Sequence, residues 1–428
     1  MKTLKVALLG CGNVGSQVAR ILLNDADVLA DRAGARLELA GIAVRNLEAK
    51  RDAGIPAELF TTDAPSLVDS ADIVIELLGG LEPAATLIRQ ALARGASVVT
   101  GNKALLAARG AELNALAFES GAQLRYEAAV AGAIPILRPI SDSLSGDRIT
   151  KIMGIVNGTT NFILDAMDTT GAQFDDVLAE AQALGYAEAD PTADVAGHDA
   201  AAKAAILASL AFHTDFAYED VHCEGITKIT AADVAAAKDA GMVIKLLAIA
   251  ERGQDGIGVR VHPTLLRRTH PLAAVHGAFN AVFVEAENAG ELMFYGAGAG
   301  GAPTASAVLG DTVAVARRVV SGGPLPAIAA QQPVKALAFD EISTSYWIGL
   351  RVSDEPGVLA AIAAIFAANS VSIEALRQSV IEENHGGSAE LRIVTHRSTE
   401  SALAAVVAAV ADLDAVQEVT SVLRVEGN

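Results

Sequence analysis

The sequence predicts an α/β protein with an N-terminal parallel sheet, a central α+β domain and a C-terminal βαββαβ domain. Three observations predict this arrangement. Short apolar runs alternate with helical segments up to about residue 130, and the alternation then becomes irregular. A stretch rich in Gly, Pro and Gln at 321–333 precedes a compact pattern of strands and helices. The 428 residues suffice for two to four domains of roughly 100–200 residues each.

The first part should form a doubly wound sheet, because its short apolar strands are separated by helices. The expected strands are 5–9, 37–44, 73–78, 97–100 and 124–126. The expected helices are 14–23, 84–93 and 104–120, with an additional loop at 24–36.

The central part should mix strands and helices, and the C-terminal part should have the ferredoxin-like order βαββαβ. In the central part we expect strands at 149–156, 258–262 and 281–287, and helices at 174–184, from near 199, and at 304–320. In the C-terminal part we expect strands at 346–353, 371–381, 388–395 and 416–424, a turn at 384–387, and helices at 358–368 and 398–411.

Composition limits the class of function. Hydrophobic residues make up 52% of the chain and charged residues 19%, so the chain can bury sizeable cores. A formal net charge of −19 argues against nucleic acid and anionic membrane surfaces as partners. The longest uncharged stretch, 292–310, is glycine-rich and contains Pro303, so it should not span a membrane. Two cysteines, Cys11 and Cys223, and no visible signal peptide indicate a cytoplasmic protein.

A glycine loop after the first strand predicts a dinucleotide site. Residues 10–15 read G-C-G-N-V-G, which fits G-x-G-x-x-G between a strand and a helix. Such a Rossmann-type loop lets the backbone approach a pyrophosphate at the helix N-terminus, whereas the alternative is a purely structural turn. The expected cofactor-binding residues here are Gly10, Gly12, Asn13, Val14 and Gly15.

The end of the second strand bears on which nicotinamide cofactor binds. A carboxylate usually holds the adenosine ribose at this position, but Arg45 stands here, followed by Lys50 and Arg51. An arginine can pair with a 2′-phosphate, so we expect NADP(H) in preference to NAD(H). The alternative is that Arg45 is an ordinary surface charge.

Two further loops follow strands, where open α/β sheets bind ligands. Gly79 and Gly80 would let a nicotinamide ribose approach closely, and Lys103 would lie near the reacting carbon unless it is a surface lysine. The further cofactor-binding residues expected here are Leu78, Gly79, Gly80, Thr100, Asn102 and Lys103.

Residues 185–203 place four acids and one lysine in a single polar segment. Asp199 and Lys203 are four residues apart and share a helix face, which suits a site wall or an ordinary surface ion pair. A lysine ammonium can stabilise an alkoxide and donate its proton during carbonyl reduction. A second lysine nearby would lower its pKa, so we predict that Lys103 and Lys203 converge beside the nicotinamide. Glu188, with its acidic neighbours, suits a substrate ammonium group, and therefore an amino acid.

The segment at 185–203 has the pattern G-Y-x-E-x-D-P-x-x-D-x-x-G-x-D-x-x-x-K and resembles the signature of homoserine dehydrogenase. The N-G-T-T-N at 157–161 and the segment at 298–304 extend the resemblance over nearly the whole chain. It implies interconversion of L-homoserine and L-aspartate 4-semialdehyde with NAD(P)(H), in threonine, methionine and isoleucine biosynthesis. It also implies that Lys203 is the acid/base with Lys103 as its partner, that Glu188 binds the substrate amino group, and that Gly301 lies near the nicotinamide. The residues that would shape the substrate pocket are Tyr186, Gly158, Thr159, Asp194 and Asp199.

The segment 127–134 resembles the alkali-cation loop of this family. Glu127 and the carbonyl groups of Val130, Gly132 and Ile134 would hold Na⁺ or another monovalent cation.

The C-terminal part resembles an ACT domain, with D-E-P-G-V-L at 354–359 as its first turn. ACT domains pair and bind amino acids, which implies threonine as a feedback effector; the alternative is a purely oligomerising domain. The resemblance divides the chain into a dinucleotide-binding domain at 1–129, completed by about 297–320, a substrate and dimerisation domain at 130–296, a linker at 321–344 and the ACT domain at 345–428. A homodimer or homotetramer is expected.

Three other hypotheses remain open at this point. His198 beside Asp199 could act as an acid/base, although a local hydrogen bond is the simpler role. Cys223 as a nucleophile would favour aspartate-semialdehyde dehydrogenase. A non-catalytic amino-acid sensor built on a dehydrogenase fold is disfavoured, because Lys103, Glu188 and Lys203 are all present.

Overall fold

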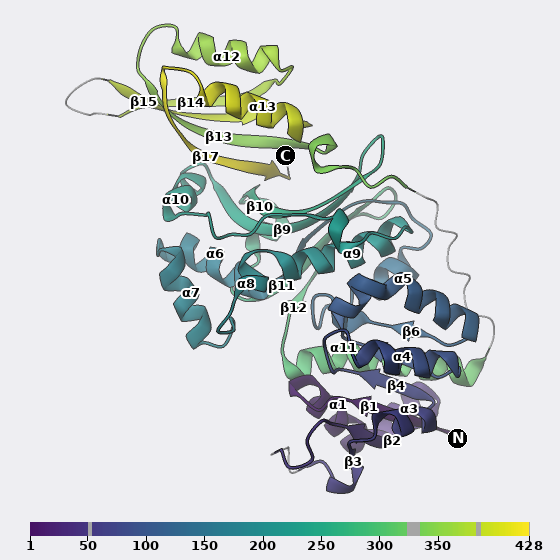
Figure 1. Cartoon of the computed structure of the whole chain (residues 1–428). Coiled ribbons are helices and arrows are strands. Elements are labelled where there is room, and N and C mark those ends of the chain that lie inside the picture. Colours follow the sequence, from purple (N-terminus) through teal and green to yellow (C-terminus); the bar gives the residue numbers. More distant parts are fainter. Residues whose placement is uncertain (50–53, 323–333, 382–386, 428) are drawn as a thin grey trace. The chain divides into compact units, whose positions relative to one another are not determined.

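The computed structural model describes residues 1–49, 54–322, 334–381 and 387–427. The chain forms two compact units (Figure 1). The first comprises Met1–Gly158, Ala202–Glu219 and Ala278–Pro333, and the second comprises Thr159–Ala201, Asp220–Gly277 and Val334–Asn428. Lys50 and Arg51, residues 323–333 of the expected linker and residues 384–386 of the expected turn lie outside the described residues.

The first unit contains a six-stranded sheet of order β3-β2-β1-β4-β5-β6. Its strands are β1 (Lys2–Leu9), β2 (Ala35–Ala43), β3 (Phe60–Thr61), β4 (Ile73–Glu76), β5 (Ser97–Thr100) and β6 (Leu124–Arg125). Every pair is parallel, which confirms the predicted doubly wound sheet. The strand order reverses between β1 and β4, so the loops after these two strands meet where such sheets bind nucleotides.

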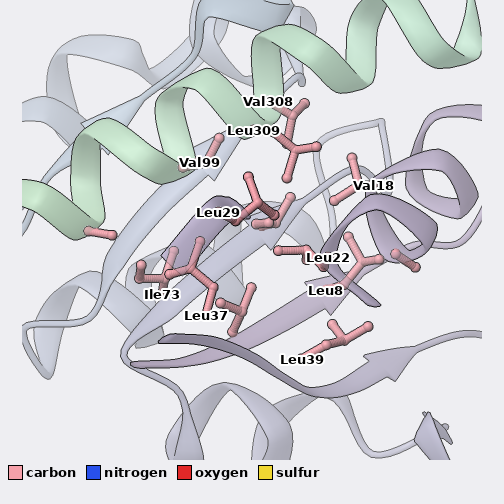
Figure 2. Packing of buried hydrophobic residues seen from close by; sticks show 14 of the residues in the cluster. Leu8, Val18, Leu22, Leu29, Leu37, Leu39, Ile73, Val99, Val308 and Leu309 are labelled. Carbon is pink, nitrogen blue, oxygen red and sulfur yellow. The ribbon is translucent and has the colours of Figure 1, made fainter. Parts of the chain in front are cut away.

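The helices around this sheet share one apolar core. They are α1 (Asn13–Asn24), α2 (Ala26–Ala33), α3 (Ala64–Ser70), α4 (Ala84–Ala93), α5 (Lys103–Ser120) and α11 (Gly301–Ser321). Figure 1 shows α11, in green, beside the purple α1, although about three hundred residues separate them. Figure 2 shows Val308 and Leu309 of α11 in the same cluster as Leu8, Val18 and Leu22.

The expected loop at 24–36 is wrong, because most of it forms α2. Leu29, Ala30 and Ala33 are buried, so one face of the segment packs into the core. Asp27 and Asp31 lie on its exposed face and made the segment resemble a polar loop. Gly34 ends the helix in the left-handed region, with φ 72°.

The first unit also contains three antiparallel strands in the order β12-β11-β7. These are β7 (Ile149–Ile155), β11 (Phe279–Ala286) and β12 (Gly290–Ala297). The sequence did not predict β12, because this glycine-containing strand buries none of its side chains fully and lacks a clear apolar alternation.

The second unit contains the strand order β9-β10-β17-β13-β15-β14. These strands are β9 (Met242–Arg252), β10 (Ile257–Arg267), β13 (Ser343–Ser353), β14 (Ile373–Ile381), β15 (Ser388–Thr395) and β17 (Val416–Glu426). Strand β17 runs parallel to β10, so the C-terminal strands continue the central ones within this unit. Two short strands, β8 (His222–Cys223) and β16 (Ser398–Thr399), pair with β10 and β13.

The helices that lie wholly or partly in the second unit are α6 (Gly158–Thr170), α7 (Phe174–Ala183), α8 (Thr192–Val195), α9 (His198–Phe212), α10 (Ala231–Asp239), α12 (Val358–Ala368) and α13 (Glu400–Ala411). The order β13-α12-β14-β15-α13-β17 confirms the predicted βαββαβ pattern. Among the described residues, we find no helix that combines the length and apolarity needed to cross a bilayer.

Candidate active site

The glycine loop after β1 has two kinds of glycine. A Cβ at Gly10 would lie 2.7 Å from the Leu77 carbonyl oxygen, and a Cβ at Gly15 would overlap the Gly10 carbonyl, so both positions need glycine for close packing. Gly12, the N-cap of α1, faces open space instead. The loop can therefore present its backbone to a ligand at the start of a helix, where a pyrophosphate is favoured. A Cβ at Gly301 would lie 2.8 Å from the Asn13 carbonyl oxygen, which places the start of α11 against this loop.

Two further loops are tied together by Glu76, a residue whose role the sequence did not predict. Its buried carboxylate accepts hydrogen bonds from Leu78 N at 2.7 Å, Gly79 N at 3.3 Å and Thr100 Oγ1 at 2.6 Å. The sequence feature that could have revealed this role is an acidic residue at the end of an otherwise apolar strand.

Asn102 connects the same two loops from the other side. Its Nδ2 donates to the Gly80 carbonyl at 2.7 Å, while its Oδ1 accepts from Leu105 N and caps α5. Gly79 and Gly80 both have φ 73° and face open space, so their backbone is accessible. Lys103 is the first residue of α5, directly after this loop.

Arg45 follows β2 at the same edge of the sheet as the glycine loop. The backbone N–H of Gly10 donates to the Ala43 carbonyl at 2.9 Å, so the two strand ends are adjacent. Arg45 is exposed. A contact of Arg45 with a 2′-phosphate stays a prediction.

Lys203 is buried on α9, and its Nζ donates to the Val156 carbonyl at 2.6 Å, just beyond the end of β7. Asp199, one turn earlier, is also only 8% exposed, so the interpretation of this pair as a surface ion pair is wrong. Lys103 and Lys203 both belong to the first unit.

The helices that carry the two lysines, α5 and α9, line one cavity of about 320 Å³. Its walls include Leu106 and Arg109 of α5, and Ile206 and Ser209 of α9. Lys103 precedes Leu106 by three residues, and Lys203 precedes Ile206 by three residues, so each lysine is close in sequence to a residue that lines the cavity. The direct approach of the two ammonium groups stays a prediction.

The predicted substrate residues of the second unit gather around Thr159. Its hydroxyl donates to the Tyr186 carbonyl at 2.6 Å and approaches Asp194 Oδ2 at 3.3 Å. Glu188 is exposed, and its carbonyl accepts from Gln182 Nε2 at 3.1 Å. The side chain of Gln182 therefore supports the loop, a role for which no pattern in the sequence provided a signal.

Gly158 opens α6 in a confined position, because a Cβ there would lie 2.7 Å from the Ala278 carbonyl oxygen.

Cys223 donates to the Ala196 carbonyl at 3.4 Å, and burial raises the pKa of its thiol. A raised pKa disfavours the thiolate, which weakens the hypothesis of a cysteine nucleophile.

The segment predicted to bind a cation is fixed by buried charges. The Glu127 carboxylate accepts from the backbone N–H groups of Ile136 and Leu137 at 2.6 and 2.7 Å, and from Arg138 N and Nε at 3.0 Å each. The backbone N–H of Glu127 donates to Asp311 at 2.7 Å. Four donors therefore engage the carboxylate, which leaves the carbonyl oxygens of the loop as the better candidate ligands.

Models of known protein families match three consecutive segments. The NAD-binding domain of homoserine dehydrogenase matches residues 10–127, homoserine dehydrogenase matches 135–313, and the ACT domain matches 346–415. The chain is 55% identical to homoserine dehydrogenase of Mycobacterium leprae, over 100% of this chain and 98% of that protein. It is 52% identical to that of Corynebacterium glutamicum, over 98% and 95%.

Solved structures agree with the sequence relatives. A homoserine dehydrogenase from Thiobacillus denitrificans superimposes with a TM-score of 0.89 at 42% identity, covering 100% of this chain and 99% of that one. A hyperthermophilic archaeal homoserine dehydrogenase in complex with NADPH gives a TM-score of 0.63 at 28% identity, covering 76% and 100%. The chain therefore belongs to the homoserine dehydrogenase family of oxidoreductases, as the 185–203 signature predicted, and it carries a C-terminal ACT domain.

Proposed function

We propose that the chain interconverts L-homoserine and L-aspartate 4-semialdehyde in the cytoplasm, with NADP(H) as the preferred cofactor, in the biosynthesis of threonine, methionine and isoleucine. The observation that carries this proposal is Lys203, a buried ammonium in the family signature, held by the Val156 carbonyl at 2.6 Å. The open backbone at Gly12, Gly79 and Gly80 supports a bound dinucleotide. The NADPH in the archaeal relative is consistent with the cofactor preference.

A bound nicotinamide would accept hydride from the carbinol carbon of homoserine, or donate it to the aldehyde. Lys203 would hold the substrate oxygen, take the hydroxyl proton during oxidation and return it during reduction. The Val156 carbonyl fixes the direction of the Lys203 Nζ. Lys103 would stabilise the same oxygen through its positive charge.

The substrate amino group would bind the acidic loop. The exposed Glu188 supplies a carboxylate for it, and Thr159 holds Asp194 and the Tyr186 carbonyl in place. Buried Asp199 would complete the pocket wall.

Initial rates of homoserine oxidation with NAD⁺ and with NADP⁺, each with and without threonine, test this proposal directly. We expect turnover with both cofactors and a higher kcat/KM with NADP⁺. Absence of homoserine oxidation with either cofactor would contradict the proposed reaction.

Arg45→Ala should raise the KM for NADP⁺ by ~10-fold, because one charge-assisted contact to the 2′-phosphate is lost. The KM for NAD⁺ should change less than about twofold, since NAD⁺ lacks that phosphate. Arg36→Ala is a suitable control, because Arg36 is an exposed arginine near the other end of β2, where it pairs with Asp27 at 3.8 Å. Equal effects on both cofactors would argue that Arg45 is only a surface charge.

The 127–134 loop fits a monovalent cation held by oxygen atoms alone. Among the described residues, no group of three or more His, Cys, Asp or Glu side chains could hold a metal ion, and the ligands proposed here are backbone carbonyl groups. We infer that Val130, Gly132, Ile134 and the carbonyl of Glu127 hold Na⁺ or a similar ion. The homoserine assay in sodium and in tetramethylammonium salts tests this, with lower activity expected in the latter.

We propose that threonine binds at the ACT domain and inhibits the enzyme, and that paired ACT domains support a homodimer or homotetramer. Deletion of this domain is a poor test, because it would remove β17 and leave the edge of β10 without its pairing strand. A point substitution in the full chain avoids that problem.

Gly357→Ala should raise the threonine concentration for half-inhibition at least ~10-fold and leave kcat without threonine within about twofold. Gly357 precedes α12 with φ 99° and faces open space, so a small ligand can approach the protein backbone there. Gly290→Ala is the matched control, because Gly290 also has positive φ and open space but lies at β12. Unaltered inhibition in Gly357→Ala would count against this binding place.

A further inference from the structure

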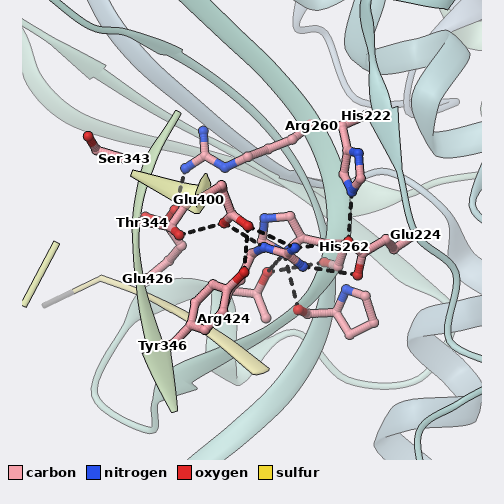
Figure 3. A network of polar contacts seen from close by, with 12 residues as sticks. His222, Glu224, Arg260, His262, Ser343, Thr344, Tyr346, Glu400, Arg424 and Glu426 are labelled. Atoms are coloured by element: carbon pink, nitrogen blue, oxygen red, sulfur yellow. Dashed lines mark hydrogen bonds and ion pairs between the residues drawn. The ribbon is translucent and has the colours of Figure 1, made fainter. Parts of the chain in front are cut away.

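A network of charged side chains joins the ACT domain to the central strands within the second unit. Figure 3 shows Arg424 of β17 between two carboxylates, those of Glu400 and Glu224. Its two Nη atoms donate to the two oxygens of Glu224 at 2.9 Å each. Its Nε and Nη2 donate to Glu400 at 2.7 and 3.1 Å. Paired contacts of this kind fix both the distance and the orientation of the partners.

The ACT side of this network is rigid. Glu400, the first residue of α13, is 3% exposed and also accepts from Thr344 Oγ1 and the Tyr346 hydroxyl at 2.6 Å each. Burial raises the pKa of Tyr346, which keeps its hydroxyl protonated as a donor. Arg424 is thus held in one orientation by its own domain, and Glu224 meets a fixed partner.

On the other side, Glu224 belongs to a segment that packs directly on the turn at 194–197. The backbone N–H of Glu224 donates to the Val261 carbonyl at 2.8 Å, and that of Ile226 donates to the Val195 carbonyl at 2.8 Å. A Cβ at Gly225 would overlap the Val195 carbonyl group, so the two segments pack too closely to admit a side chain at this position. The backbone at 224–226 is therefore in direct contact with this turn.

The turn at 194–197 carries one of the proposed substrate residues. Asp194 begins it, and its carboxylate lies 3.3 Å from the Thr159 hydroxyl. The N–H of Gly197 donates to the Asp194 carbonyl at 2.9 Å, and the Gly197 carbonyl accepts from Ala201 N in the first turn of α9. The contacts run without interruption from Arg424 to Asp194.

We propose that Glu224 is a positioning residue, whose pairing with Arg424 sets the position of the 194–197 turn and of the Asp194 carboxylate. This inference rests on the proposed function, in which Asp194 shapes the homoserine pocket. Any movement of β17 or α13 in the ACT domain would then alter homoserine binding through Glu224. The expected signature is a change in the KM for homoserine, with kcat and the KM for NADP⁺ nearly constant.

Glu224→Gln in the full-length protein is the primary test. It removes the charge and half of the paired contact, while Arg424 keeps Glu400, so the fold should persist. We expect the KM for homoserine to rise ~3–10-fold, with kcat and the KM for NADP⁺ within about twofold. Amide hydrogen exchange in residues 191–201 should become at least about threefold faster. Arg424→Lys keeps the charge but loses the fork geometry, and it should change both readouts in the same direction.

Arg351→Gln is the matched control, because Arg351 pairs with Glu418 at 3.0 Å between β13 and β17, away from Glu224. It should alter neither the KM for homoserine nor the exchange of 191–201. Glu224→Gln with exchange and KM equal to those of Arg351→Gln would overturn the inference. If the wild type oxidises no homoserine, the proposed function fails, and the exchange comparison alone then decides whether Glu224 holds the turn.

Discussion

Replacing Lys203 by alanine should lower kcat for homoserine oxidation by ~10²–10⁴-fold, the range expected when a general acid/base is removed. Lys203 is buried, and its Nζ is held 2.6 Å from the Val156 carbonyl, and alanine has no group that could exchange a proton with the substrate oxygen. The dissociation constant of NADP(H) should stay close to normal, because the glycine loop at 10–15 is untouched. Stopped-flow turnover and fluorescence titration of NADPH measure the two quantities separately.

Two further variants separate the roles of charge and proton transfer. Lys203→Arg keeps the positive charge, but a guanidinium does not release its proton at neutral pH, so kcat should remain at least ~10²-fold below wild type. Lys228→Ala removes an exposed lysine and should have no effect on turnover. Wild-type turnover in Lys203→Ala would contradict the assignment of Lys203 as the acid/base.

In the wild type, the buried Lys245 should make the free energy of unfolding rise by about 2–3 kcal/mol between pH 7 and pH 10, and Lys245→Met should abolish this rise. Lys245 is fully buried in β9, where its Nζ donates to Asn161 Oδ1 at 3.0 Å and to the Val275 carbonyl at 2.7 Å. Asp165 Oδ1 is 4.0 Å away. Burial lowers the pKa of Lys245 from 10.5 to about 8, and the nearby acids only partly oppose this shift.

The sign follows from the protons bound in each state. Between pH 8 and 10.5 the unfolded chain keeps the lysine proton and the folded chain has lost it, so the free energy of unfolding rises with pH. The variant lacks this rise, so its stability relative to wild type should fall as pH increases. Urea midpoints at pH 7 and pH 10 measure the difference.

Lys238→Met is the matched control for this measurement. Lys238 is exposed on α10, and its Nζ donates to the Asp168 carbonyl at 3.0 Å. Its substitution should shift both urea midpoints equally. A Lys245→Met variant that also shifts both midpoints equally would show that the buried ammonium does not govern this pH range.

The elements that the sequence predicted well are those with local signals. The helix 84–93 agrees with α4 residue for residue, and 358–368 agrees with α12. Periodic apolar positions, glycine at helix ends and the G-x-G-x-x-G loop all act over fewer than about twenty residues, so the chain displays them directly.

The strand β9 shows where this reasoning fails. Its first nine residues are all buried, so it reads as a continuous apolar run, and such a run is compatible with either a helix or a strand. Its pairing with β10 decides the matter, and that partner is invisible in a local window. The same strand carries Lys245, whose burial gives a lysine in an apolar run its unusual pKa.

The sequence alone determined the family, the order of the domains and the chemical types at the site, because the spacing of acids, glycines and Lys203 is a property of the chain. Only the tertiary structure decided which of these groups are buried and what holds them. Burial and hydrogen-bond geometry depend on residues far away in sequence, as when Glu76 ties Thr100 to Leu78, or Arg424 reaches Glu224. The approach of Lys103 to Lys203 is a prediction of the same kind, since two charges distant along the chain meet only if the folded backbone brings them together.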